Sequence, residues 1–474
     1  MNSIFKNISF TFASNLICTF ISVLVTFILP KCISVENYGY YQLYFFYVTY
    51  TGFLHFGWAD GLYLRYAGAY YKSLDKELFG SQFKAYCAVE LILGIVLCLL
   101  SLIFVQGEQR ILVFILIGVS ASINLPKTYL QYLLQGTNRI KEYAVQTTLE
   151  RIIFGIVIVA IVCFGKDSFV FAIMADILGK FIALLYEIIQ CRELIQSRFF
   201  ISKELIKEIL VNINVGIKLM LANIASHLIL GTVRWSIEQK WNVSVFGKIS
   251  LTMSVSHIMM IFIRSVSMVM LPALRRTDEK KYAGIYNDIK VVLFVFMFGG
   301  LFIYYPLNLF LTYWLPDYAD CLKYMAILFP LCIFEGKLSI LVEMYLKTMR
   351  LEKNILSSNV ATLVFSVLVT FVSIFILENL SLAVLGMLVI FAFRTTIGEF
   401  LLSRHLEISF YKNIFIELFL VVSFVGSSWL VGGAKGFGIY FASYLVYLLF
   451  NRKKIQMIVK DRILKKKSAV STNE

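Results

Sequence analysis

Several cationic side chains lie inside strongly apolar segments of this chain, and five of them are candidates for binding a ligand. An Arg or Lys at the centre of a membrane helix costs about 3 kcal/mol on insertion scales, so such residues usually face a protein interior or a watery cavity. Guanidinium groups bind phosphate oxygens through two parallel hydrogen bonds, and buried cations attract anions. The sequence therefore predicts a cationic cavity for a phosphate-bearing molecule. Its candidate binding residues are Arg234, Arg264, Lys127, Lys337 and Arg394.

The depths expected for these cations differ. Arg264 is expected toward the cytoplasmic side, Lys337 and Arg394 near the middle, and Arg234 near the outer face. Neither Arg234 nor Arg264 has an obvious carboxylate nearby in the sequence. Cations placed at successive depths could bind a phosphate group in turn as it crosses the membrane.

Polar side chains recur at helical spacing in the same segments. Asn15 belongs to a stripe of Thr and Ser residues, and Asn223 lies 208 positions later, followed by His227. His257 lies seven residues after Ser250 and seven before Arg264. Residues spaced in this way share one face of a helix. We include Asn15, Asn223, His227 and His257 in the candidate cavity, although such groups also link helices, at under about 1 to 2 kcal/mol per hydrogen bond.

Three carboxylates are candidates for coupling transport to an ion gradient. Asp60, Glu335 and Glu343 could bind a proton or sodium ion, although Asp60 could instead pair with Arg65. The membrane potential alone would also act on an anionic cargo. The eight cysteines show no C-x-x-C spacing, so we expect no metal site or other cofactor.

The elements that carry these residues are membrane spans. The chain of 474 residues is 59% hydrophobic and 15% charged, which is far from the composition of a soluble domain. A bilayer core needs about 20 apolar residues per helix. By this rule the fourteen predicted spans are 8–29, 38–63, 84–105, 111–134, 143–164, 168–190, 214–236, 245–271, 288–312, 322–346, 355–377, 380–402, 413–431 and 436–450.

The first twelve spans form an internal repeat. VENYGYYQL at residues 35–43 matches VSVFGKISL at residues 243–251, and this offset of 208 carries spans one to six onto spans seven to twelve. Because six spans return the chain to its starting side, the repeats are parallel. The expected fold is all-α, with two six-helix lobes and an appended helical hairpin. The expected regions are 1–190, an amphipathic cytoplasmic linker at 191–212, the second lobe at 213–405, the hairpin at 406–451 and a basic tail at 452–474.

Positive charge gives the orientation. Loops on one side and the two termini hold 29 Lys and Arg residues, whereas the opposite loops hold 6. Cytoplasmic loops retain positive charge, so both termini are expected in the cytoplasm. The net charge of +15 then reflects topology and contact with membrane lipids, and no nucleic-acid partner is expected.

Two prolines are candidate hinges. Pro126 lies in span four and Pro330 in its repeat partner, span ten. Proline inside a helix removes a backbone hydrogen bond and permits a kink. Bending at both positions would suit alternating access, although a static kink explains the prolines equally well.

Several short motifs resemble those of a known family. The segments are ENYGYYQL at 36–43, HFGWADGLYLRYAG at 55–68, LLQGTNRIKEYA at 133–144 and WLPDY at 314–318. Together they resemble Wzx-type flippases of the multidrug/oligosaccharidyl-lipid/polysaccharide (MOP) superfamily. This resemblance implies a MATE-like fold in a bacterial cytoplasmic (inner) membrane. It also implies alternating access that moves undecaprenyl-pyrophosphate-linked oligosaccharide outward for O-antigen, capsule or exopolysaccharide synthesis, with a polysaccharide polymerase and a chain-length regulator as partners.

Three other functions are considered. A peptidoglycan lipid-precursor flippase would share the cationic cavity. A cation-coupled multidrug exporter is less favoured, since span one has no Asp or Glu. A polysaccharide polymerase or ligase is less favoured again, because no outer loop exceeds the length of a simple helix connection. The protein is therefore expected to be a transporter and not an enzyme.

Overall fold

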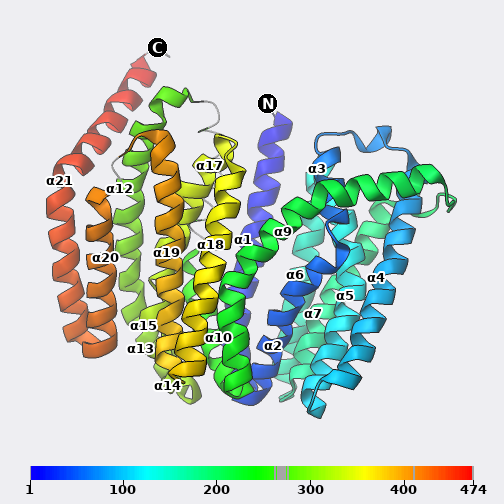
Figure 1. The fold of residues 1–474 in the computed structure, drawn as a ribbon, viewed down its shortest axis with the longest axis horizontal. Coiled ribbons are helices and arrows are strands. Elements are labelled where there is room, and N and C mark those ends of the chain that lie inside the picture. Colours follow the sequence, from blue (N-terminus) through cyan, green and yellow to red (C-terminus); the bar gives the residue numbers. More distant parts are fainter. Residues whose placement is uncertain (1, 261–262, 264–273, 275–276, 409–410, 472–474) are drawn as a thin grey trace. The chain divides into compact units, whose positions relative to one another are not determined.

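Helices make up the secondary structure of the chain. The computed structural model (Figure 1) describes residues 2–260, 263, 274, 277–408 and 411–471, and no strand occurs among them. Their contacts form two compact units. The first unit comprises Met1–His227 with Trp241–Lys248, and the second comprises Leu228–Lys240 with Ile249–Glu474.

Long antiparallel helices build the first unit. Helix α4 packs along α5, and α6 packs along both α7 and α1. Side-chain caps fix several helix starts: the Asp75 carboxylate accepts hydrogen bonds from the backbone at the start of α4, and Ser168 does the same for α7. The helices are α1 (Asn2–Cys32), α2 (Val35–Thr51), α3 (Trp58–Tyr66), α4 (Lys76–Phe104), α5 (Glu108–Gly136), α6 (Ile140–Cys163), α7 (Phe169–Gln190), α8 (Arg192–Ile195) and the first part of α9 (Lys203–Lys240).

The second predicted span is a broken helix. After α2 the chain makes a 3-10 turn at Gly52–His55, and Phe56 and Gly57 then adopt positive φ values of 50° and 81° before α3 begins. Glycine suits position 57 for two reasons. It adopts a positive φ without strain, and a Cβ there would lie 2.4 Å from the backbone nitrogen of Ile217 in α9. Hydropathy alone did not show this break.

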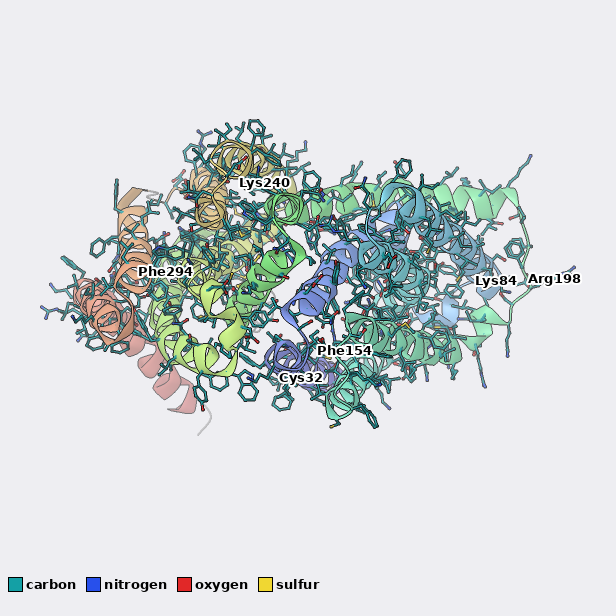
Figure 2. The ribbon with its side chains drawn as sticks, turned by 90° about the horizontal axis from the view of Figure 1, so that it is seen from below. Cys32, Lys84, Phe154, Arg198, Lys240 and Phe294 are labelled. Carbon is teal, nitrogen blue, oxygen red and sulfur yellow. The ribbon has the colours of Figure 1, made fainter. Side chains whose placement is uncertain are left out.

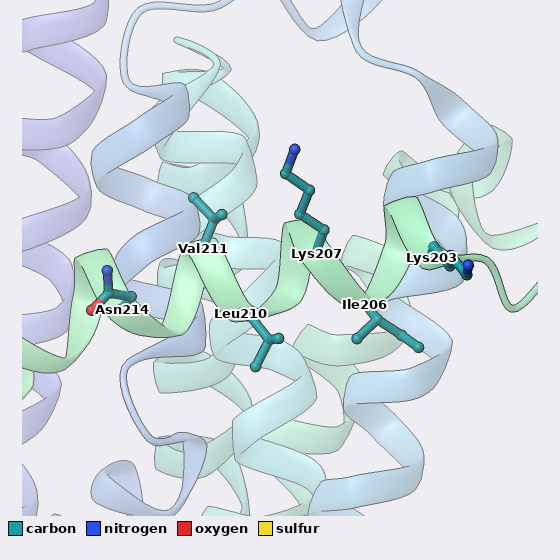
Figure 3. A pocket seen from close by; sticks show the side chains of 6 residues that line it. All are labelled: Lys203, Ile206, Lys207, Leu210, Val211 and Asn214. Atoms are coloured by element: carbon teal, nitrogen blue, oxygen red, sulfur yellow. The ribbon is translucent and has the colours of Figure 1, made fainter.

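The segment expected as a linker is fused to the seventh span. Residues 191–202 hold only the short α8, and α9 then runs without interruption from Lys203 to Lys240. The division of the chain into two units therefore falls inside α9, after His227, and again inside α10, after Lys248. In Figure 3, Ile206 and Leu210 point to one side of α9, and Lys207 and Val211 point to the other. Figure 2 shows Lys84 and Arg198 at the same end of the ribbon, where the Lys84 ammonium donates to the carbonyl oxygen of Ser197.

The second unit surrounds one almost fully buried span. This span, Met325–Thr348, contains α15, α16, a wide π-helical turn at Leu338–Glu343, and α17. It packs against α12 and α19. The helices of this unit are α10 (Val243–His257, whose first residues belong to the first unit), α12 (Tyr282–Gly300), α13 (Tyr304–Trp314), α14 (Ala319–Leu322), α15 (Met325–Leu328), α16 (Leu331–Lys337), α17 (Met344–Thr348), α18 (Glu352–Thr370), α19 (Leu380–Leu406), α20 (Tyr411–Val425) and α21 (Gly433–Ser471).

The appended hairpin packs on the second unit. Tyr440 and Tyr444 of α21 donate hydrogen bonds to the carbonyl oxygens of Phe298 and Val295, at 2.8 and 2.9 Å. Helix α21 continues to Ser471, so most of the basic tail is helical. The second helix of the hairpin is therefore tied to the last two turns of α12.

Twelve helices in the described residues are long and apolar enough to cross a membrane. Two predicted spans are missing from that set. Residues 38–63 are divided between α2 and α3, and most of 245–271 after α10 lies outside the described residues. The all-α polytopic fold is confirmed, with fourteen as an approximate count.

The two prolines differ from the expectation of matched hinges. Helix α5 continues through Pro126. Pro330 does separate two helices, since α15 ends at Leu328 and α16 begins at Leu331. Proline is tolerated at a helix start because no intrahelical bond needs its missing N–H.

Candidate functional site

Lys337 lies in a buried cluster of two lysines and two glutamates, which we call the charge tetrad: Lys290 of α12, Lys337 of α16, Glu399 of α19 and Glu417 of α20. The Lys337 ammonium is 2.5 Å from Glu399 and 2.6 Å from Glu417, and the Lys290 ammonium is 2.6 Å from Glu399 and 3.2 Å from Glu417. All four residues are at most 4% exposed.

The tetrad neutralises Lys337, which the sequence placed among the candidate binding cations. Its two positive charges match its two negative charges, and the Tyr286 hydroxyl adds a 2.7 Å hydrogen bond to Glu399. Lys290 is also buried here. A closed network of this kind holds helices together and leaves little charge for a ligand.

Arg394 is held by polar groups from two neighbouring elements. Its Nε and Nη2 atoms donate to the Asn359 side-chain oxygen at 3.1 and 2.8 Å. Its Nη2 atom also lies 3.8 Å from a carboxylate oxygen of Glu343, whose other oxygen pairs with Lys347 at 2.8 Å. The candidate cation Arg394 and the candidate coupling residue Glu343 are thus near neighbours, at the end of the π-helical turn.

The remaining candidates of the second unit lie on α9, α10 and α16. The Arg234 guanidinium donates to the Ser250 hydroxyl at 3.0 Å. His257 and Glu335 approach to 3.8 Å, and their side chains are 36% and 15% exposed. Arg264 lies outside the described residues. The structure therefore pairs His257 with Glu335, two residues that the sequence assigned to different roles.

Lys127 in the first unit is also paired. Its ammonium lies 2.6 Å from a carboxylate oxygen of Glu150 in α6, and the residue is 5% exposed. Lys180 and Asp176, four residues apart on α7, form an ion pair at 2.6 Å, and the Tyr44 hydroxyl donates to Asp176 at 2.8 Å. Tyr44 is fully buried, so its side chain serves packing and this hydrogen bond.

Three polar candidates of the first unit are exposed. Asn15 of α1 and both Asn223 and His227 of α9 lie on the surface of their apolar helices. A polar side chain at such a position is costly in contact with hydrocarbon and is suited to water or a polar ligand. These residues remain candidates for contact with hydroxyl or phosphate groups.

Asp60 has a different neighbour from the one expected. It lies 3.8 Å from His55, and both residues are buried beside the break between α2 and α3. Arg65 instead contacts Glu208 at 2.9 Å and the Asn212 side-chain oxygen at 2.6 Å. Pairing of Asp60 with Arg65 is therefore wrong, because α9 supplies closer partners for the arginine.

The contacts with Glu208 also affect a tyrosine at the end of α3. The Tyr66 hydroxyl donates a short hydrogen bond to Glu208. Burial and this carboxylate raise the pKa of Tyr66 to about 12. Tyr66 therefore stays neutral at physiological pH and acts as a hydrogen-bond donor that fixes α3 to α9.

Two hollows occur on the helix surfaces. One, of about 480 Å³, lies over Lys203, Ile206, Lys207, Leu210, Val211 and Asn214 of α9 (Figure 3). The other, of about 340 Å³, has apolar walls from α16, α19 and α20 that include Phe334, Leu388, Val389 and Leu418. The second can accept a hydrocarbon chain but offers no charged group to orient a headgroup.

Sequence reasoning missed the partners of the buried lysines. Glu150, Glu399 and Glu417 all lie within predicted spans, so carboxylates in apolar segments were a visible signal. The partners were hidden because they lie on other helices, 23 residues from Lys127 and 62 and 80 residues from Lys337. Helical spacing reveals only pairs within one helix.

Solved structures share this fold. A structure titled as the lipid II flippase MurJ in an inward closed conformation superposes with a TM-score of 0.67 at 13% identity, covering 95% of this chain and 100% of that one. A MATE-family multidrug resistance transporter of the MOP superfamily, inward-facing, gives a TM-score of 0.55 at 15% identity, covering 83% and 98%. No protein-family model matches the chain, and no curated protein matches it. The chain therefore has the fold of MOP-superfamily transporters.

Proposed function

We propose that the protein is a flippase that moves undecaprenyl-pyrophosphate-linked oligosaccharide units from the inner to the outer leaflet of a bacterial cytoplasmic membrane. The units would supply a surface polysaccharide such as O-antigen, capsule or exopolysaccharide. Alternating access between two repeated lobes would move them. Both termini would lie in the cytoplasm.

The observation that carries the proposal is the fold shared with the lipid II flippase MurJ over nearly the whole chain. MurJ is named for a lipid-linked cargo, and the polysaccharide-flippase motifs of this sequence point to the same class of cargo. At 13% identity the likeness to MurJ concerns the fold and does not choose between cargoes. The choice of the polysaccharide branch rests on the sequence motifs.

The polar groups available suit a sugar pyrophosphate. Arg234 and Arg394 can each offer guanidinium donors to phosphate oxygens. Asn15, Asn223 and His227 lie exposed on apolar helices and can bind sugar hydroxyls. Lys127 and Lys337 are less suited, because each already contacts a carboxylate within 2.6 Å.

Two transporter alternatives keep some support. A peptidoglycan lipid-precursor flippase fits the fold equally well, and a multidrug exporter fits through the MATE-like fold. The exporter would need an accessible anionic site for cationic drugs. The candidate coupling carboxylates Glu335 and Glu343 lie 3.8 Å from His257 and Arg394, respectively.

Gene deletion in the host separates these functions. Loss of surface polysaccharide, with lipid-linked oligosaccharide trapped on the inner leaflet, is expected. Loss of viability with trapped lipid II would identify the peptidoglycan alternative. Intact polysaccharide with altered sensitivity to cationic drugs would contradict the proposal and identify an exporter.

Replacing Arg234 tests the cationic site. Arg234→Ala is expected to lower polysaccharide export about ten- to a hundredfold, since a hydrogen bond to a charged group contributes about 1.5 to 3 kcal/mol. The matched control is Lys240→Ala on the same helix, whose ammonium pairs with the exposed Glu378 at 2.5 Å. Export should be measured at equal protein levels in the membrane. Full export by Arg234→Ala would remove this residue from the site.

A further inference from the structure

Glu187 is a buried carboxylic acid near the end of α7. The residue is 0% exposed. Among the described residues, neither of its two carboxyl oxygens has a hydrogen-bond partner. Burying an isolated carboxylate is so unfavourable that such a group usually takes up a proton. Glu187 therefore differs from the paired glutamates of the charge tetrad.

The nearest charges form a set with too few cations. Glu187 lies within electrostatic range of both Lys127 and Glu150. Lys127 pairs with Glu150 at 2.6 Å, and the Gln146 side-chain amide donates to the same carboxylate oxygen at 3.4 Å. We call Lys127, Glu150 and Glu187 the acidic triad. It contains one positive charge for two carboxyl groups.

The other charged groups around α7 are already engaged. The helices packed against α7 are α2, α5, α6 and α8. On α7 itself Lys180 pairs with Asp176, which also accepts from Tyr44 of α2. Arg139, just before α6, binds Glu142 and both the carbonyl and the side-chain oxygen of Gln190. On α8, Arg192 and Glu193 are exposed. Arg151 of α6 lies within electrostatic range of Asp176, and the buried Cys191 thiol lies within range of Glu187. Among the described residues, Lys127 is the cation whose charge acts on Glu187.

We propose that Glu187 is a proton-binding site, neutral while Lys127 pairs with Glu150. A proton is favoured over a metal ion because the described residues contain no group of three or more metal-binding side chains. The geometry thus assigns the proton to a residue outside the coupling set predicted from sequence, which was Asp60, Glu335 and Glu343.

Proton release has a direct structural consequence. An ionised Glu187 would compete with Glu150 for the single ammonium of Lys127, which joins α5 to α6 in this structure. Lys127 would then be shared between α6 and α7. Glu187 lies three residues before the end of α7, on the side predicted to be cytoplasmic, so protons would exchange with that side. This inference concerns the resting protein and does not depend on the transported molecule.

Infrared spectroscopy of the purified full-length protein tests the proposal. A protonated carboxylic acid and a carboxylate absorb at different frequencies, and the acid band shifts in deuterated water. Glu187→Gln should remove intensity from the acid band at neutral pH. Loss of carboxylate intensity instead would overturn the proposal, because it would show that Glu187 is ionised.

A second variant tests the exchange of partners. Glu150→Gln leaves Lys127 with Glu187 as its only carboxylate in the triad, so Glu187 should ionise and the acid band should be lost although Glu187 is present. An acid band that persists in Glu150→Gln would overturn the exchange. The matched control is Glu417→Gln in the charge tetrad, which should reduce only the carboxylate bands. Size-exclusion profiles establish that each variant is folded, and the two triad variants give independent readings.

Discussion

The charge tetrad of the second unit and the acidic triad of the first unit are both buried, and both join three or more helices. They differ in their balance. The tetrad has two lysines for two glutamates, with every ammonium within 3.2 Å of two carboxylates. The triad has one lysine for two glutamates, and one of the two has no partner among the described residues. Where buried lysines and glutamates are equal in number, all of them can stay charged and hold their helices together. Where a glutamate has no matching cation, it can take up or release a proton.

The comparison separates two meanings of a charged residue inside a membrane helix. Such residues are functional candidates by default. Lys337 was a functional candidate in the sequence, yet in the structure it is neutralised by two glutamates and links helices. Glu187 was not singled out, yet its surroundings leave it able to titrate. Partners, more than burial, distinguish the two cases.

The largest effect is expected from removing a cation of the tetrad. Lys337→Met leaves Glu399 and Glu417 with only Lys290, and breaking a buried ion pair from one side costs about 3 to 5 kcal/mol. Thermal unfolding of the purified protein in detergent should show a strongly lowered midpoint. A midpoint equal to that of the wild type would contradict the comparison, because the tetrad would then not stabilise the protein.

A smaller effect is expected from the same change made in each region. Glu417→Gln should destabilise the protein by about 1 to 3 kcal/mol, since it removes a charged hydrogen-bond partner. Glu187→Gln should leave the unfolding midpoint nearly unchanged, because the amide resembles the protonated acid in size and charge. Both midpoints should be measured in one buffer at neutral pH. Equal losses in the two variants would contradict the difference between the regions.

The smallest effect is expected at an exposed pair. Lys347 and Glu343 are four residues apart, and the lysine side chain is 50% exposed. Lys347→Met should lower stability by less than about 0.5 kcal/mol, as for other pairs of this kind. The same unfolding measurement provides the reference for Lys337→Met. A large loss would show that Lys347 supports Arg394 through their shared contact with Glu343.

Much of the fold could be predicted from the sequence because membrane spans are long and uniformly apolar. The all-helical class and the approximate number of spans followed from composition and hydropathy. The break at Phe56 and Gly57 could not, because it depends on the close approach of α9 and leaves the apolar character of residues 38–63 unchanged. The continuity of α9 was hidden for a similar reason, since a charged amphipathic segment and an apolar span can share one helix.

The candidate site was less predictable. Residue type and helical spacing identified polar positions. A pair such as Asp176 and Lys180 can be read from spacing alone, because both residues lie on one helix. The partners of Lys127, Lys337 and Arg65 come from other helices, so they depend on tertiary packing. For these residues, the sequence shows that a charge is buried but not whether it is neutralised.

The tetrad also affects the order in which the protein can be made. Its two lysines and Glu399 lie on α12, α16 and α19, whereas Glu417 lies on α20, outside the repeat. During synthesis the earlier helices must therefore enter the bilayer with one uncompensated positive charge. That charge is neutralised only when α20 has been translated and inserted. The last hairpin thus completes the assembly of the second unit, and a nascent chain halted before residue 417 would be a substrate for membrane quality control.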